Sequence, residues 1–127
     1  MRKYFNPVSA ACLLTCCMMI AAVAVEGPWS AKVPDKDRAR QNPYAGDPQA
    51  VAVGKKLFQQ HCASCHGATA EGKSKHPNLL SETIRNAKSG ELLWLLTNGS
   101  LGKGMPSWSR LPEQQRWQII TYLKTLQ

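Results

Sequence analysis

Apolar positions recur with a helical period from Pro48 to about residue 60 or 61, and this pattern predicts the first helix of the chain. The recurring positions are Val51, Gly54, Leu57, Phe58 and His61. Asp47 before Pro48 marks the helix start, because an aspartate side chain caps the first turn and proline suits the first helical position. Gly54 costs the helix about 1 kcal/mol relative to alanine. Close contact with another backbone or ring would explain why glycine stands there.

Two more helices are predicted in the second half of the chain. Residues 91–97 are mostly leucine and form a short apolar helix that Asn98 and Gly99 end. Pro112 or Glu113 opens the last helix, which carries apolar residues almost to the end of the chain. The remaining segments are a loop over 67–81, a short turn over 82–88 and a second loop over 101–109. No segment has the alternation of a strand, so the pattern predicts an all-α fold.

The first 24 residues have the features of a secretory signal. Arg2 and Lys3 form a basic start, an uncharged apolar stretch follows over 8–20, and Ala22 to Ala24 form a small-x-small cleavage site. The apolar stretch is shorter than the ~20 residues of a comfortable membrane span. We therefore expect export to the periplasm, with a mature chain that begins at Val25. Membrane attachment would require the signal to stay uncleaved.

Residues 25–46 carry prolines and charges but no apolar period. This composition predicts an extended arm or linker rather than a second domain. The ordered domain is then expected over residues 47–127. A core this small seldom contributes more than ~3–5 kcal/mol unaided, so a covalently held group would serve as a staple.

The run from Cys62 to His66 has the pattern C-x-x-C-H, which is the attachment signature of c-type haem. The two thiols can form thioethers to the two vinyl groups of one porphyrin, and His66 can then bind the iron axially. The other three of the five cysteines lie in the predicted signal, so Cys62 and Cys65 belong to no wider disulfide framework. The implied cofactor is one covalently attached haem c.

A six-coordinate haem iron needs a second axial ligand, and the candidates are His61, His76 and Met105. His61 directly precedes Cys62, so the motif directs it away from the iron. His76 follows His66 so closely that reaching the opposite haem face would demand a very tight crossing. Met105 lies in a glycine-rich loop that can present its sulfur across the porphyrin edge. His/Met ligation leaves no open coordination position and favours electron transfer over oxygen or peroxide chemistry.

Three segments resemble the class I (monohaem) cytochrome c family. The stretch from Gly54 to Gly67 is similar to the N-terminal helix and haem motif of that family, Gly104 to Pro106 resembles its distal methionine segment, and Trp117 to Leu126 resembles its C-terminal helix. The resemblance covers about residues 54–126. It implies a small cytochrome c fold, in which the N- and C-terminal helices cross around one covalently bound haem.

The resemblance implies specific neighbours at the helix crossing. Gly54 and Phe58 of the first helix would meet Ile119 and Tyr122 of the last. Such a crossing would supply the close contact that Gly54 requires.

The resemblance also implies further residues of the haem pocket. Pro77 matches the family's proline after the haem motif, whose carbonyl accepts a hydrogen bond from the ring N–H of the proximal histidine, here His66. Leu79 would line the proximal side. Trp94 and Trp108 would either pack near the haem and its propionates or serve as core aromatics.

The charge of the chain bears on its partners. The formal net charge is +8, and loss of Arg2 and Lys3 with the signal lowers it by two. Basic residues are dispersed without aromatic interleaving, which argues against nucleic acid. Five lysines lie near the segments expected to surround the haem edge: Lys55, Lys56, Lys73, Lys75 and Lys103. They either steer acidic redox partners or are ordinary solvated side chains.

The leading hypothesis is therefore a periplasmic electron carrier and not an enzyme. By analogy with similar small cytochromes, its donor would be a periplasmic dehydrogenase and its acceptor a terminal oxidase or another cytochrome. The alternatives are a cytochrome subunit, or a haem enzyme or sensor with a labile distal ligand. A thiol-disulfide oxidoreductase lacks its βαβ context, and a zinc module lacks a second pair of ligands.

Overall fold

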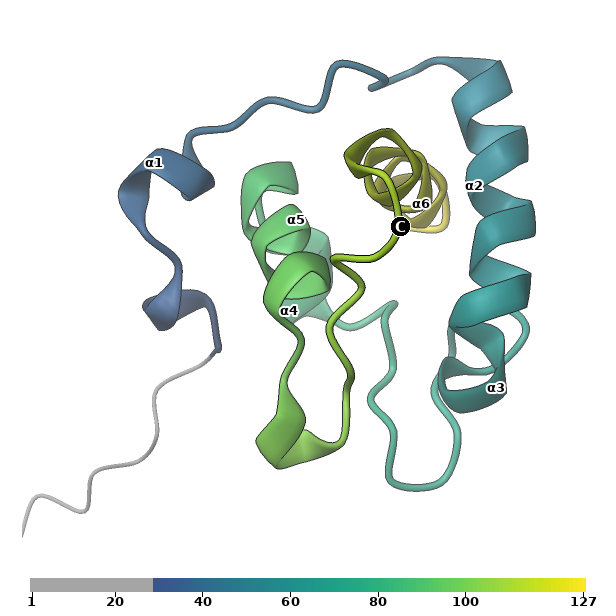
Figure 1. Cartoon of the computed structure of the whole chain (residues 1–127). Helices are drawn as coiled ribbons and strands as arrows, with labels where there is room; N and C mark the ends of the chain where they lie inside the picture. The colour runs from purple at the N-terminus through teal and green to yellow at the C-terminus, as the bar shows by residue number, and fades with distance from the viewer. Residues whose placement is uncertain (1–28) are drawn as a thin grey trace, which may run out of the picture.

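The structure is a computed structural model that describes residues 29–127, and this part of the chain is helical without a named strand (Figure 1). This confirms the predicted all-α fold. The longer helices are α2 (Pro48–His61), α5 (Ser89–Asn98) and α6 (Glu113–Thr125). The short elements are η1 (Trp29–Lys32), α1 (Asp35–Arg38), α3 (Ala63–His66), α4 (Glu82–Asn86) and η2 (Leu101–Lys103).

Helices α2 and α6 cross, and the crossing is centred on Gly54. In Figure 1, α6 is seen nearly end-on beside the upright α2. A methyl group on Gly54 would place its carbon 1.9 Å from the carbonyl oxygen of Gln118 and 3.0 Å from Cβ of Tyr122. One turn further along α2, the fully buried Phe58 ring lies 5.6 Å from the Tyr122 ring, centroid to centroid. Gly54 therefore lets the two backbones touch, although its nearest neighbours are Gln118 and Tyr122 rather than Ile119.

The boundaries of the helices follow from local capping. The Asp47 carboxylate accepts a hydrogen bond from the Gln49 N–H at 2.8 Å, which confirms the predicted start of α2. Helix α5 begins two residues earlier than the leucine-rich pattern predicts. The reason is that the Glu91 carboxylate accepts from the Lys88 N–H at 2.7 Å and closes a turn ahead of the leucines.

The segment before α2 differs from the extended arm that its composition predicts. Residues 29–38 form the turns η1 and α1, and α1 packs on α5 (Figure 1). Val33 is 4% exposed, and Arg38 forms an ion pair with the buried Glu91. A methyl group on Gly90 would place its carbon 2.1 Å from the carbonyl oxygen of Asp37, so the first turn of α5 touches the α1 backbone. Polar contacts together with a few isolated apolar side chains hold this segment, and neither leaves an apolar period in the sequence.

The chain between α1 and α2 is held to α6 by further polar contacts. The Asn42 amide donates to the Thr121 hydroxyl at 2.9 Å, and that hydroxyl donates to the Tyr44 carbonyl at 3.4 Å. Arg40 hydrogen-bonds Glu113 at the start of α6, and this contact lowers the pKa of the Glu113 carboxyl below its usual range. The segment therefore contacts both α5 and α6.

The predicted signal over residues 1–24 lies outside the described residues. Within residues 29–127, no helix is both long and apolar enough to cross a membrane.

Replacement of Gly54 by alanine is expected to destabilise the protein strongly. The added methyl group collides with backbone atoms of Gln118, which cannot swing aside as a side chain would. We expect the free energy of unfolding to fall by about 3 kcal/mol, even though alanine gains helix propensity. Urea denaturation followed by far-ultraviolet circular dichroism measures the change.

The control for this variant is Val53→Ala, at the neighbouring position, where the side chain is 40% exposed. We expect its effect to stay within about 0.5 kcal/mol. Equal effects of the two substitutions would contradict the close crossing at Gly54.

Candidate haem site

A cavity of about 780 Å³ lies between α2, α3, α5, α6 and the two long loops. Seven of the eight predicted site residues line it: Cys62, Cys65, His66, Pro77, Leu79, Met105 and Trp108. The rest of the wall is mostly apolar and includes Phe58, Ile84, Leu92, Leu95, Leu96, Ile119, Ile120 and Leu123. The fold thus gathers residues from distant parts of the chain around one apolar space.

Trp94 is the predicted site residue that does not line the cavity. The reason is the phase of α5, which turns about 100° per residue. Leu92, Leu95 and Leu96 form one face of the helix and line the cavity, which leaves the Trp94 side chain on the opposite face. The structure therefore corrects the placement of Trp94 in the haem pocket.

The C-x-x-C-H run forms a tight turn at the end of α2. The Cys62 N–H still donates to the Phe58 carbonyl of α2 at 2.8 Å, while the Cys62 carbonyl accepts from the N–H groups of Cys65 at 3.1 Å and His66 at 2.9 Å. This turn sets both cysteines and the histidine at the cavity wall. The position of the motif is thus set by α2, and that of α2 by its crossing with α6.

The two thiols have different environments. Cys62 is 9% exposed, whereas Cys65 is exposed. Burial, with a smaller contribution from the nearby Cys65, raises the pKa of the Cys62 thiol to about 12. Cys62 is therefore uncharged at neutral pH, and a thioether at this position would be uncharged as well.

His66 has one ring nitrogen engaged and the other free. Its Nδ1 lies 3.1 Å from the carbonyl oxygen of Pro77, which is the contact implied by the family resemblance. A carbonyl only accepts, so Nδ1 is the donor of this bond, and in the neutral imidazole the lone pair is then on Nε2. The loop that carries Pro77 is fixed in turn, because the Gly72 N–H donates to the His66 carbonyl at 2.8 Å and Leu79 N–H donates to Ala70 at 2.9 Å. His66 is thereby oriented as a metal ligand.

Met105 sits in a loop that is closed on itself. Ser100 and Met105 exchange two backbone hydrogen bonds, of 2.9 and 3.1 Å. At the neck of the loop, the Ser107 hydroxyl donates to the Thr97 carbonyl at 2.6 Å, and the Trp108 N–H donates to Leu96 at 2.8 Å. The loop is therefore fixed to the end of α5, and Met105 is presented half-buried at the cavity wall.

Both other axial candidates also line the cavity. The His61 ring packs against the Trp108 ring with 5.2 Å between centroids, and the His76 ring lies 6.4 Å from the His66 ring. The cavity wall also includes Trp29, which the sequence patterns did not predict. Trp29 belongs to a stretch without apolar period, and its large aromatic side chain was the only available signal.

The lining fits a haem group. The volume of the cavity falls in the range of about 300–1,000 Å³ that is usual for ligand and cofactor sites, and the cavity wall is mainly apolar. The possible donors at the wall are the two thiols, the Met105 thioether sulfur and the imidazoles of His61, His66 and His76. Residues 29–127 contain no group of three or more His, Cys, Asp or Glu side chains suited to a bare metal ion. The donors suit an iron that brings four nitrogens of its own in a porphyrin.

A helical fold with a C-x-x-C-H turn at an apolar cavity defines the cytochrome c class. The chain belongs to the family described as cytochrome C oxidase, cbb3-type, subunit III, whose model matches residues 49–123. Membership in a cytochrome c family implies covalently bound haem c and electron transfer through it.

Relatives and a solved structure agree with this assignment. Cytochrome c-554(547) of Halothiobacillus neapolitanus is 37% identical in an alignment 94 residues long that covers 65% of this chain and 99% of that protein. The cbb3-type cytochrome c oxidase subunit CcoP of Rubrivivax gelatinosus is 38% identical over 63 residues, which are 49% of this chain but only 21% of that protein. The crystal structure of cytochrome CL from Methylophaga aminisulfidivorans MPT matches with a TM-score of 0.58 and 27% identity, over 67% of this chain and 58% of that one.

Replacement of Gly99 by alanine is expected to displace Met105. Gly99 has φ +71°, and a methyl carbon there would lie 2.7 Å from the carbonyl oxygen of Met105 and from backbone atoms of Pro106 and Ser107. The strain of about 2 kcal/mol or more is relieved by opening the loop neck. In the oxidised haem-loaded protein, we expect loss of the weak far-red absorption band that accompanies methionine–iron bonding.

Gly102→Ala is the matched control, because a methyl group at that loop position meets nothing within 4 Å. Its spectrum should match that of the unmodified protein. Retention of the far-red band in Gly99→Ala would contradict the importance of the loop neck.

Proposed function

We propose that residues 47–127 form an electron carrier with one covalently bound haem c. Cys62 and Cys65 would hold the haem through thioethers, and His66 and Met105 would be the axial ligands of its iron. The observation that carries this proposal is that one apolar cavity gathers both thiols, the oriented imidazole and the methionine loop. The family assignment supports the cofactor, and the geometry supports the residues.

The residues around the cavity have separate tasks in electron transfer. The haem iron supplies a one-electron couple. The Pro77 carbonyl holds the His66 ring and raises the basicity of Nε2. As a ligand of the haem iron, the thioether of Met105 would favour the reduced state and raise the reduction potential. The leucine and isoleucine wall keeps water away from the site. If His66 and Met105 both bound the iron, they would leave no position on it for a substrate, so the proposed role is transfer rather than catalysis.

The proposed pathway is periplasmic. The signal over residues 1–24 would export the chain, and one haem would pass electrons from a periplasmic dehydrogenase to a terminal oxidase or another cytochrome. The names of the relatives support redox partners of this kind, since they include a cbb3-type oxidase subunit and a bc1 complex cytochrome c subunit of Corynebacterium diphtheriae. The partners themselves are a proposal.

A second candidate function is that of a cytochrome subunit within an oxidase complex. The family description and the CcoP relatives favour it. The carrier is favoured by the match to cytochrome c-554(547), which covers 99% of that protein. Haem-stained native gels of membrane and periplasmic fractions separate the two: a carrier runs alone in the periplasmic fraction, and a subunit migrates with a membrane complex.

Covalent haem is tested by the pyridine haemochrome spectrum of the exported protein. We expect one haem per chain that survives acid–acetone extraction. Cys62→Ser with Cys65→Ser should abolish the retained haem, because serine forms no thioether to the vinyl groups. Ser64→Ala, inside the same motif, is the control and should retain it. Extractable haem in the unmodified protein would rule out the proposal.

Met105→Ala is expected to open the sixth coordination position of the iron. The oxidised spectrum should become high-spin, and the midpoint potential should fall, since the methionine sulfur favours the reduced state. Leu101→Ala is the control in the same loop, because the Leu101 side chain is 78% exposed and lies outside the cavity wall. A spectrum of Met105→Ala identical to that of the parent would mean that another residue, such as His76, binds the iron.

Two of the five lysines near the haem motif and loops, Lys75 and Lys103, line the cavity. We expect charge reversal at both positions to slow oxidation of the reduced protein by ferricyanide about tenfold at low ionic strength, because anion steering is lost. The difference should shrink near 1 M salt, where the Debye length is about 3 Å. Stopped-flow kinetics measures both rates.

Lys55→Glu with Lys56→Glu makes the same change in net charge away from the cavity wall and is the matched control. Oxidation of this double variant by ferricyanide should slow less than that of the variant with charge reversal at Lys75 and Lys103. A parent rate that does not depend on ionic strength would contradict steering by these lysines.

A further inference from the structure

Trp29 is a cavity-lining residue from outside the family domain. Among the described residues, it alone lines the cavity from a position before α2, and the family model begins only at residue 49. The Trp29 ring is partly buried and packs against the hydrophobic core. One aromatic residue of the cavity wall therefore comes from the segment that precedes the family domain.

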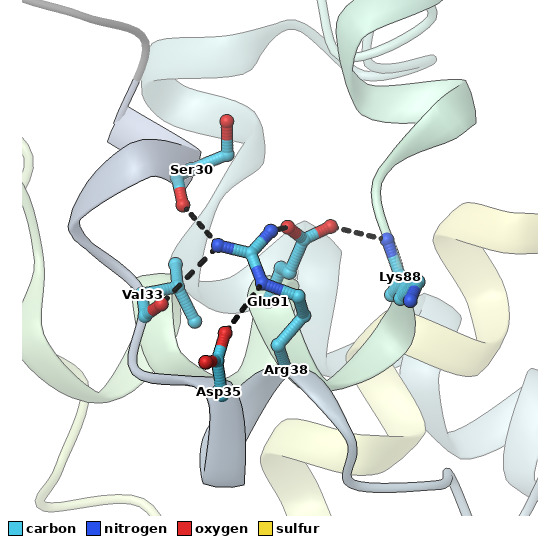
Figure 2. A network of polar contacts seen from close by, with 6 residues as sticks. All are labelled: Ser30, Val33, Asp35, Arg38, Lys88 and Glu91. Atoms are coloured by element: carbon cyan, nitrogen blue, oxygen red, sulfur yellow. Dashed lines mark hydrogen bonds and ion pairs between the residues drawn. The ribbon is translucent and has the colours of Figure 1, made fainter.

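A single guanidinium fixes the turn that carries Trp29. One Nη atom of Arg38 donates to the carbonyl of Ser30 at 2.9 Å and to that of Val33 at 3.2 Å. The other Nη atom pairs with the carboxylate of Glu91. Figure 2 shows the guanidinium between the η1 turn and α5, with Glu91 reaching on to the Lys88 N–H. Since Ser30 is the neighbour of Trp29, Arg38 determines where the Trp29 backbone lies.

The same contact reaches helix α5, which also lines the cavity. Glu91 is 6% exposed and lies in the first turn of α5, the helix that carries the cavity-lining Leu92, Leu95 and Leu96. A buried carboxylate that lost its partner would be costly, so the pair stays closed. Arg38 and Glu91 thereby hold Trp29 and the leucine wall in one fixed arrangement.

We infer that Trp29 is a haem-contacting residue that covers part of the haem and raises its reduction potential, with Arg38 as its positioning residue. The inference rests on the proposed function, because it requires haem in this cavity. The physical reason is solvation: oxidised haem carries one more positive charge than reduced haem, and water stabilises the more highly charged state. An indole ring in the wall excludes that water and favours the reduced state.

The test compares midpoint potentials from redox titrations of haem-loaded variants. Trp29→Ala should have a lower midpoint potential than the parent, and Trp29→Phe should restore most of it because an aromatic cover remains. Trp94→Ala is the matched control, since Trp94 is also a half-buried tryptophan but does not line the cavity. Its potential should equal that of the parent. If Trp29→Ala fails to accumulate, the midpoint potential of Trp29→Leu is measured instead. Leucine is apolar but smaller than tryptophan, so this potential should also lie below that of the parent.

Arg38→Lys tests the positioning step. Lysine keeps the positive charge beside Glu91 but lacks the planar fork that also reaches Ser30 and Val33. We expect a midpoint potential shifted in the same direction as in Trp29→Ala. An unchanged potential in Arg38→Lys would overturn the role of Arg38, and equal potentials in Trp29→Ala and Trp94→Ala would overturn the role of Trp29. Absence of covalent haem in the parent protein would instead overturn the proposed function. The pyridine haemochrome spectrum of the parent detects that case independently of the midpoint potentials.

Discussion

The contact between Gly54 and the backbone of α6 is the constraint on which the remaining structure depends. The absence of a side chain at Gly54 allows α2 to lie directly on Gln118 and Tyr122, with the Phe58 ring beside the contact. The end of α2 is thereby placed over the core, and the C-x-x-C-H turn continues from it without a break. The helix crossing, rather than the motif itself, therefore determines where the cysteines lie.

The other half of the site has a different physical basis. Met105 is held by backbone hydrogen bonds within its own loop and by the Ser107–Thr97 contact at the neck, not by packing of a long helix. The His66 side is held by a carbonyl of a neighbouring loop. The cavity thus combines one rigid wall, built on α2, α5 and α6, with two loops that are fixed by few polar contacts. Such loops give the domain its site without enlarging its core.

The sequence pattern predicted the helices correctly, because capping and the apolar period act between residues that are close in the chain. Asp47 and Pro48 marked the start of α2, and the period of the apolar residues identified α2, α5 and α6. The role of the N-terminal segment was not predictable, because Arg38 meets Glu91 only after folding, and ion pairs between distant residues have no period. Trp94 was misplaced for a related reason: a tryptophan in a short leucine-rich helix gives no sign of which face meets the cavity.

The helix crossing also bears on the order of events during synthesis. A chain grows from its N-terminus, so the C-x-x-C-H motif is complete well before α6 (Glu113–Thr125). Helix α2 alone is short enough to be marginal in water, and its partner surface does not exist until Gln118 and Tyr122 have been made. Cys62 is 9% exposed in the folded chain, so its thiol is more accessible before α6 packs on α2 than afterwards. The packing of α6 on α2 thus completes the wall on which both cysteines lie.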